Sequence, residues 1–160
     1  MAKTIGYLIT WTTYGSWLQG DKRGYVKKGR TYPAKQSLAD SNRQRLSREV
    51  IKLTKKHRQI VANAILRKAG QLNQKVYALA VTSKHVHIVA GYIHKPIGQV
   101  VSHYKNAAQS ALRKGDLCGR IWTKGFDKRF CFDEHSLRNR INYVESHNNN
   151  NSAIISSSIY

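Results

Sequence analysis

Two histidines separated by one residue are the first feature of the sequence that suggests chemistry. His85 and His87 flank Val86 within residues 85–92, where apolar residues alternate with others. This alternation predicts a strand, on which side chains two residues apart point to the same face with backbones about 7 Å apart. Two imidazoles placed in this way can bind one metal ion. Because the same spacing occurs by chance in many chains, a purely structural role for the pair stays open.

The last predicted helix carries a tyrosine away from its apolar face. Asp133 is expected to cap this helix, which runs to about His147. Its apolar stripe consists of Leu137, Ile141 and Val144. At about 100° per residue, Tyr143 lies roughly 160° from the centre of that stripe. His147, four residues later, shares the side of the helix that carries Tyr143. Tyr104, by contrast, lies within the apolar stripe of its own helix and is expected in the core.

A tyrosine and imidazoles together suggest phosphoryl transfer. A tyrosine hydroxyl can attack a phosphodiester and form a phosphotyrosine, but its ordinary pKa of about 10 means that it needs activation. A metal ion held by imidazoles would polarise the phosphate oxygen and neutralise developing charge. A site with two metals and three carboxylates is disfavoured, because the chain has 8 Asp and Glu residues and no D-x-D cluster.

The chain is strongly basic. Its 160 residues include 28 Lys and Arg against 8 Asp and Glu, which gives a net charge of +20 at pH 7. So large an excess of cations destabilises a compact chain unless a polyanion neutralises it, and nucleic acid is the first candidate. Because 41% of the residues are hydrophobic, the composition excludes a disordered basic tail and indicates a globular domain.

Cysteine content and hydropathy narrow the class further. Cys118 and Cys131 make no disulfide framework and match no common zinc spacing. The longest apolar runs, such as residues 76–81, are far shorter than the ~20 residues of a membrane span, and the N-terminus lacks the apolar core of a signal peptide. We therefore expect a cytoplasmic protein with no membrane partner.

The elements that must position these residues follow from periodicity, caps and breakers. Strands are expected at 4–13, 76–81, 85–92, 121–123 and 129–132, with a long basic loop over 14–45. Helices are expected at 55–69, capped by Thr54 and stopped by Gly70, from about Pro96 to Gly115, and from Asp133 to about His147. This order predicts an α+β fold, a ferredoxin-like antiparallel sheet with helices on one face plus the C-terminal helix that carries Tyr143. We expect one domain over 1–147 and a low-complexity, disordered tail over 148–160.

Together these motifs resemble a known family. The H-x-H strand, the amphipathic helix after it, the Trp-containing strand pair and the final helix with YVESH at 143–147 resemble the single-tyrosine HUH transposases, which include the REP-associated tyrosine transposases. The segment WTTYGSWL at 11–18 is similar to a divergent subgroup of transposases. The resemblance covers roughly residues 5 to 147.

The resemblance implies an enzyme that cleaves and rejoins single-stranded DNA at hairpin ends through a 5′-phosphotyrosine, with Mg²⁺ or Mn²⁺. His85 and His87 match the metal-binding histidines, and Tyr143 matches the nucleophile. His147 stands where relatives carry a metal-binding Gln, and a histidine there would favour Zn²⁺, Co²⁺ or Mn²⁺ over Mg²⁺. Ser83–Lys84 replaces the Asn or Asp that often precedes the first histidine, which would weaken the orientation of the ligands. The partner implied is single-stranded or hairpin DNA, and the choice between monomer and homodimer stays open.

Two other functions remain open at this point. A domesticated relative could bind DNA hairpins without cleaving them, and a covalent protein–DNA adduct would exclude it. A basic RNA-binding domain could stack bases on Trp11, Trp17 and Trp122, and preference for RNA over the same DNA sequence would favour it.

Overall fold

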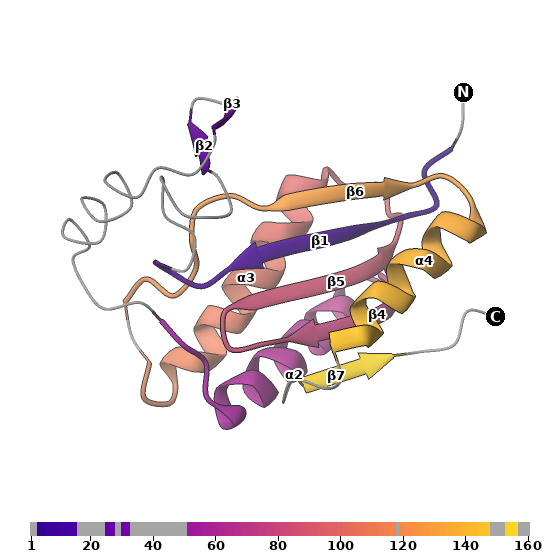
Figure 1. Cartoon of the computed structure of the whole chain (residues 1–160). Helices are drawn as coiled ribbons and strands as arrows, with labels where there is room; N and C mark the ends of the chain where they lie inside the picture. Colours follow the sequence, from indigo (N-terminus) through magenta and orange to yellow (C-terminus); the bar gives the residue numbers. More distant parts are fainter. Residues whose placement is uncertain are drawn as a thin grey trace.

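The computed structural model describes residues 3–15, 25–27, 30–32, 51–117, 119–147 and 153–156. Its main feature is an antiparallel sheet with the strand order β6-β1-β5-β4-β7 (Figure 1). The strands are β1 (Gly6–Thr12), β4 (Val76–Val81), β5 (His85–Gly91), β6 (Asp127–Cys131) and β7 (Ala153–Ser156). The helices are α2 (Lys55–Gln71), α3 (Ile97–Arg113) and α4 (Glu134–Glu145). The first four strands in this spatial order, with α2 following β1 and α3 following β5, make the ferredoxin-like arrangement that the sequence predicts.

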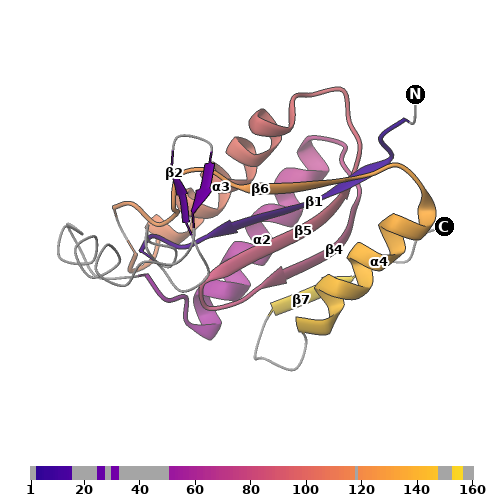
Figure 2. The same cartoon turned by 45° about the horizontal axis from the view of Figure 1, so that its top comes forward.

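The helices form two layers on opposite faces of the sheet. Helices α2 and α3 cover one face and α4 lies across the other (Figures 1 and 2). The reason is visible in β1, where Tyr7, Ile9 and Trp11 enter the core beneath α2 and α3 while Leu8 enters a smaller core beneath α4. Because both faces of the central strands are apolar, both need a cover.

The caps of α2 and α4 agree with the sequence, whereas the end of α2 does not. The Thr54 side chain accepts a hydrogen bond from the His57 backbone, and the Asp133 side chain accepts one from the Ser136 backbone. Helix α2 continues through Gly70 to Gln71, so the expected stop at Gly70 is wrong. The chain turns instead at Asn73, whose φ of 52° lies in the left-handed region that Asn tolerates better than most residues.

A polar network fastens α3 to the sheet. Tyr104 is fully buried, as its helical position predicts, and its hydroxyl donates to Gln74 Oε1 over 2.5 Å. The Gln74 amide in turn donates to the Tyr7 hydroxyl at 2.6 Å and to the Gly91 carbonyl at 2.8 Å. Every side chain in this chain of bonds has a partner, so the network stabilises the core rather than exposing reactive groups.

The segment between α3 and β6 differs from expectation. Residues 121–123 do not form a strand but make one bridge, between Trp122 and Thr13. Ile121 and Trp122 are buried all the same, and the Ile121 carbonyl accepts a hydrogen bond from the Tyr14 backbone. The segment thus packs against the core at two consecutive residues, and its backbone forms a single bridge just beyond the end of β1.

Two segments that were expected to lack strands contain them. Four residues of the tail expected to be disordered, 153–156, form β7 beside β4. Within the expected basic loop, β2 (Tyr25–Lys27) pairs with β3 (Arg30–Tyr32) as a separate two-stranded sheet. Apart from residues 14–15, 25–27 and 30–32, that loop lies outside the described residues, and Trp17 with it. Cys118 also lies outside them, whereas Cys131 is a buried free thiol. In the part of the chain that the structure describes, no helix has the length and apolarity needed to cross a membrane.

Candidate active site

Strand β5 places two histidines on the face that α4 covers. Val86 and Ile88 point into the core beneath α2 and α3, so His85 and His87, which alternate with them, point to the opposite side. His87 is only 6% exposed and lies opposite Thr10 of β1 in the register of the sheet. The two imidazole rings are nearly parallel, with centroids 5.8 Å apart. The strand therefore presents the H-x-H pair as the sequence predicts.

Helix α4 brings Tyr143 and His147 to the same place. Leu137, Ile141 and Val144 are buried against the sheet and fix the rotation of the helix. Tyr143 on the other side of the helix is 49% exposed, which confirms that it is not a core residue. His147 follows the end of α4 and is partly buried.

His87 lies at the centre of a cluster of four rings. Its ring centroid is 4.6 Å from that of His147, 5.9 Å from that of Tyr143 and 5.8 Å from that of His85. The rings of Tyr143 and His147 are 5.1 Å apart and nearly perpendicular. The fold thus gathers all four residues that the sequence selects, although β5 and α4 are far apart along the chain.

The electrostatics of the cluster keep its central histidine neutral. Burial, with smaller contributions from His147 and His85, lowers the pKa of His87 to about 3. At neutral pH this imidazole therefore carries no charge, and one of its two nitrogens has a lone pair for a hydrogen bond or a metal ion.

Neighbouring oxygens orient the rings. Thr10 Oγ1 is 2.9 Å from His87 Nδ1, which directs the other nitrogen, Nε2, away from β1. His147 Nδ1 lies 3.0 Å from the Tyr143 carbonyl and 3.2 Å from the Val144 carbonyl. Because carbonyls only accept hydrogen bonds, this Nδ1 must carry the proton, and Nε2 of neutral His147 holds the lone pair. Metal-binding histidines in proteins are held by such hydrogen bonds.

Sequence reasoning missed Thr10 and Thr82 as supporting residues. Thr82 Oγ1 accepts a hydrogen bond from the His85 backbone at 2.9 Å and lies 3.5 Å from His85 Nδ1. Its position in the turn before the first histidine could have suggested this role. Thr10 gives no such signal, because its contact with His87 depends on the register between two strands, and the two residues are 77 positions apart in the sequence.

The donor set suits a divalent cation, although the rings do not yet converge on one point. Imidazole nitrogens are ligands that Mn²⁺, Co²⁺ and Zn²⁺ accept. Among the described residues, no three His, Cys, Asp or Glu side chains stand close enough together to hold an ion as they are placed. His85, His87 and His147 therefore fit a metal in chemical type, and binding would require their rings to reorient.

A solved transposase shares this fold. No protein-family model matches the sequence, and no curated protein matches it significantly. Among solved structures, a REP-associated tyrosine transposase bound to a REP hairpin aligns with a TM-score of 0.53 and 12% identity over 90% of this chain and 67% of the other. A protein from Deinococcus radiodurans R1 with a provisional transposase assignment aligns with a TM-score of 0.48 and 16% identity over 91% and 92% of the two chains. At such identities the similarity to the hairpin-bound transposase concerns the fold alone.

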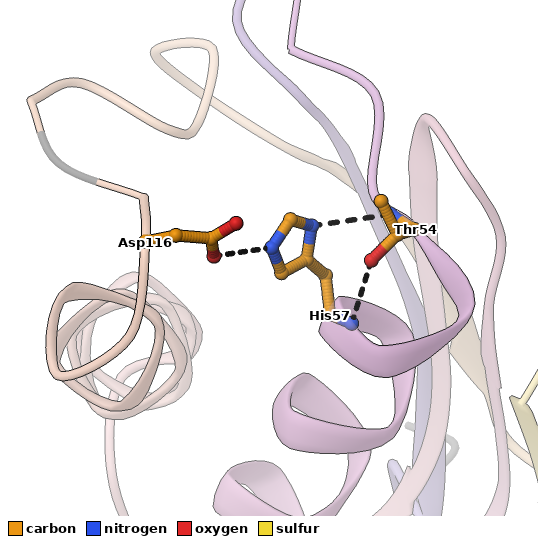
Figure 3. A network of polar contacts seen from close by, with 3 residues as sticks. All are labelled: Thr54, His57 and Asp116. Carbon is orange, nitrogen blue, oxygen red and sulfur yellow. Dashed lines mark hydrogen bonds and ion pairs between the residues drawn. The ribbon is translucent and has the colours of Figure 1, made fainter.

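A second histidine site has the residue types of a hydrolase triad but another role. His57 Nε2 donates to Asp116 Oδ1 over 2.7 Å, and His57 Nδ1 accepts from the Thr54 backbone at 3.2 Å (Figure 3). The Thr54 hydroxyl accepts from the His57 backbone and makes no hydrogen bond with the ring. No base therefore activates that hydroxyl, and the trio caps α2 and ties it to the segment after α3.

Proposed function

We propose that this chain is a metal-dependent transposase that cleaves and rejoins single-stranded DNA at hairpin ends through a 5′-phosphotyrosine. The observation that carries the proposal is the cluster in which the rings of His85, His147 and the exposed Tyr143 lie beside that of His87, formed from parts of the chain that are distant in sequence. The fold shared with a transposase that was solved with a REP hairpin supports DNA as the partner. The net charge of +20 supports a polyanionic substrate.

Tyr143 is the nucleophile in this proposal. Its phenolic oxygen attacks the phosphorus, a Tyr–O–P bond forms, and the bond from phosphorus to the 3′ oxygen of the preceding nucleotide breaks. The phenolic proton is lost to water, and the departing 3′ oxygen takes a proton from water. A 3′ hydroxyl later attacks the phosphotyrosine and reverses these steps, which rejoins DNA. Since one phosphodiester replaces another, no nucleotide cofactor is needed.

His85, His87 and His147 would hold the cation, Mg²⁺ or Mn²⁺. When bound, the cation would neutralise charge on the scissile phosphate. The neutral state of His87 leaves a lone pair for this purpose at neutral pH. Thr10 contacts Nδ1 of His87 and the end of α4 contacts Nδ1 of His147, so in both rings Nε2 is the nitrogen left for the cation.

The structure weakens the RNA-binding alternative. Trp11 is 2% exposed and Trp122 is 5% exposed, and the two rings pack edge to face with centroids 5.8 Å apart. Neither ring is free to stack on a base, so the tryptophans within the described residues belong to the core.

The test is a search for a covalent adduct. The full chain is incubated with Mn²⁺ and a pool of single-stranded DNA hairpins, and products are separated on a denaturing gel and mapped by peptide mass spectrometry. We expect an adduct on Tyr143 that disappears in Tyr143→Phe and persists in Tyr77→Phe, a partly buried tyrosine packed near the same face of the sheet. Absence of any adduct, or an adduct on another residue, would refute the proposed mechanism.

A further inference from the structure

A pocket lies on the other face of the sheet from Tyr143. It has a volume of about 410 Å³, and Tyr7, Tyr92, His94, Lys95 and Phe130 are among the residues that line it. Tyr7 belongs to the core beneath α2 and α3, which places the pocket on that face. The segment that joins β5 to α3 passes the edge strand β6 at this end of the sheet (Figure 2). At about 3.3 Å per residue, Tyr92 lies roughly 17 Å along the strand direction from His87.

The walls of the pocket are exposed aromatic rings. Tyr92 is 43% exposed and Phe130 is 42% exposed, which is unusual for such large side chains. The buried Tyr7 ring packs edge to face against Phe130, with centroids 6.2 Å apart, and the hydrogen bond from Gln74 holds the Tyr7 hydroxyl. Phe130 is therefore supported from below while part of its ring faces solvent.

Basic side chains lie beside these rings. Lys128 Nζ lies 5.7 Å from the centre of the Phe130 ring, Lys95 is an exposed lining residue, and His94 packs edge to face on Tyr92 at 5.3 Å. None of the described residues that line the pocket is acidic. An aromatic surface beside lysines matches a nucleotide, whose base has a flat apolar face and whose phosphate is an anion.

We infer that this pocket binds an unpaired base of the DNA strand at a position distant from the scissile phosphate. The base stacks on Phe130 and Tyr92, and Lys95 and Lys128 contact the adjoining phosphates. This inference rests on the proposed function for the identity of the strand as DNA. The contact is made on the opposite face from Tyr143, so it concerns recognition and leaves the chemistry to the histidine cluster.

The experiment is a binding cycle that needs no cleavage. In the Tyr143→Phe background, the affinity for a labelled single-stranded oligonucleotide is measured by fluorescence anisotropy at about 150 mM salt. Each nucleotide is replaced in turn by an abasic one. Each oligonucleotide is then tested with three proteins, namely the parent, which carries Phe130, and its variants Phe130→Leu and Phe132→Ala. Leucine keeps an apolar side chain without a ring, and Phe132 is a matched control because it is 50% exposed and does not line the pocket.

We expect Phe130→Leu to weaken binding by about fivefold to 100-fold, because this is the affinity that stacking of one base on an aromatic ring usually contributes. Phe132→Ala should bind like the parent. At one or two positions, the abasic replacement should weaken binding of the parent by the same factor as Phe130→Leu does. At those positions the replacement should not weaken binding of Phe130→Leu any further. Equal affinity of Phe130→Leu and the parent, or equal losses at every abasic position in both proteins, would overturn the base site. The base site would also be overturned if Phe130→Leu changed the molecular mass of the DNA-free protein in solution, because the pocket would then bind a second copy of this chain.

Thermal unfolding of each variant checks that Phe130→Leu folds, and Phe130→Tyr, which keeps the ring, should restore the affinity. Adduct formation is measured on the wild-type chain alone. If no adduct forms but the binding measurements give the expected pattern, the transposase chemistry is refuted and the base site is supported. If an adduct forms but the binding measurements do not give that pattern, the base site is refuted and the transposase chemistry is supported.

Discussion

Thr10 is the residue whose removal tests the support of the histidine cluster most directly. Its hydroxyl lies 2.9 Å from His87 Nδ1 across the sheet. Thr10→Val keeps the shape of the side chain and removes the hydrogen bond. We expect Mn²⁺ affinity and the rate of adduct formation to fall by about 10- to 100-fold, as for other residues that orient metal ligands. Calorimetric titration of Mn²⁺ measures the first, with Thr12→Val on the same strand and face as the control.

His147 is the residue at which the cluster departs from the pattern that it resembles. We expect His147→Ala to weaken Mn²⁺ binding more than about tenfold, because a ligand is lost. His147→Gln should restore part of the activity and shift the preference towards Mg²⁺, since an amide oxygen is a harder ligand than an imidazole. His135→Ala, at the other end of α4, is the control. Matching calorimetric isotherms for the wild type and His147→Ala would exclude His147 as a ligand.

The candidate site shows what can be predicted from residue types alone. His85 and His87 were recognisable from the period of a strand, and Tyr143 and His147 from their angle to an apolar stripe. These are local patterns, and a single sequence displays them. The contact of Thr10 with His87 depends on strand register, and the pocket beside Phe130 depends on how the segment between β5 and α3 meets the edge strand β6. Both are properties of tertiary structure that no local pattern contains.

At the scale of elements, α4, which carries Tyr143, begins at the cap that Asp133 makes. The backbone hydrogen bond from Ser136 lowers the pKa of the Asp133 carboxyl. The ionised cap therefore stabilises the fold above the ordinary pKa of about 3.9, and this contribution disappears as the pH falls through the lower folded value. We expect Asp133→Ala to be less stable than the wild type at neutral pH, with a difference that shrinks in acid. Urea unfolding at both pH values measures it.

Asp133→Ser supplies the control for that measurement. Serine caps a helix without a titratable group, so its stability relative to Asp133→Ala should not shrink in acid in the same way. A constant difference between the wild type and Asp133→Ala at all pH values would contradict the role of the ionised carboxylate.

The N-terminus of α2 depends on a histidine in the position that Glu or Gln usually takes in a capping box. His57→Gln can keep the reciprocal bond to Thr54, whereas His57→Ala cannot. We expect His57→Ala to lower the free energy of unfolding by roughly 0.5–2 kcal/mol and His57→Gln to lower it less. Chemical denaturation compares the two, and equal losses would show that the contact with Asp116, rather than the cap, carries the effect.

Elements were more predictable than their placement. The strand at 76–81 appears with the expected bounds, and the caps at Thr54 and Asp133 are where the sequence puts them. The side of the sheet that α4 covers was not fixed by its own stripe, because that choice depends on Leu8 and Val89 making a second apolar face. Residues 121–123 have the pattern of a strand, but their hydrogen bonds go mainly to the chain around Tyr14 rather than to a ladder.

For the whole molecule, charge predicts how binding responds to salt. If the basic residues that give the net charge of +20 make about 6–10 phosphate contacts, the affinity for DNA should fall by about 10³- to 10⁵-fold between 50 and 200 mM salt. Hairpins with single-stranded flanks should bind more tightly than perfect duplex, because stacking needs unpaired bases. Anisotropy titrations over a salt series test both. A flat salt response, or equal affinity for the two DNA forms, would argue against this mode of binding.

The pairing of β7 with β4 affects where the chain can be shortened. Residues 153–156 cover the backbone of Ala78–Val81, and without them β4 would become the border of the sheet with unpaired N–H and C=O groups. Such a border recruits strands from other molecules. A protein ending at residue 147 keeps every member of the histidine cluster, yet we expect it to self-associate with rising concentration in sedimentation experiments. The pairing of residues 153–156 with β4 would then protect the protein from aggregation, a role separate from catalysis and from DNA binding.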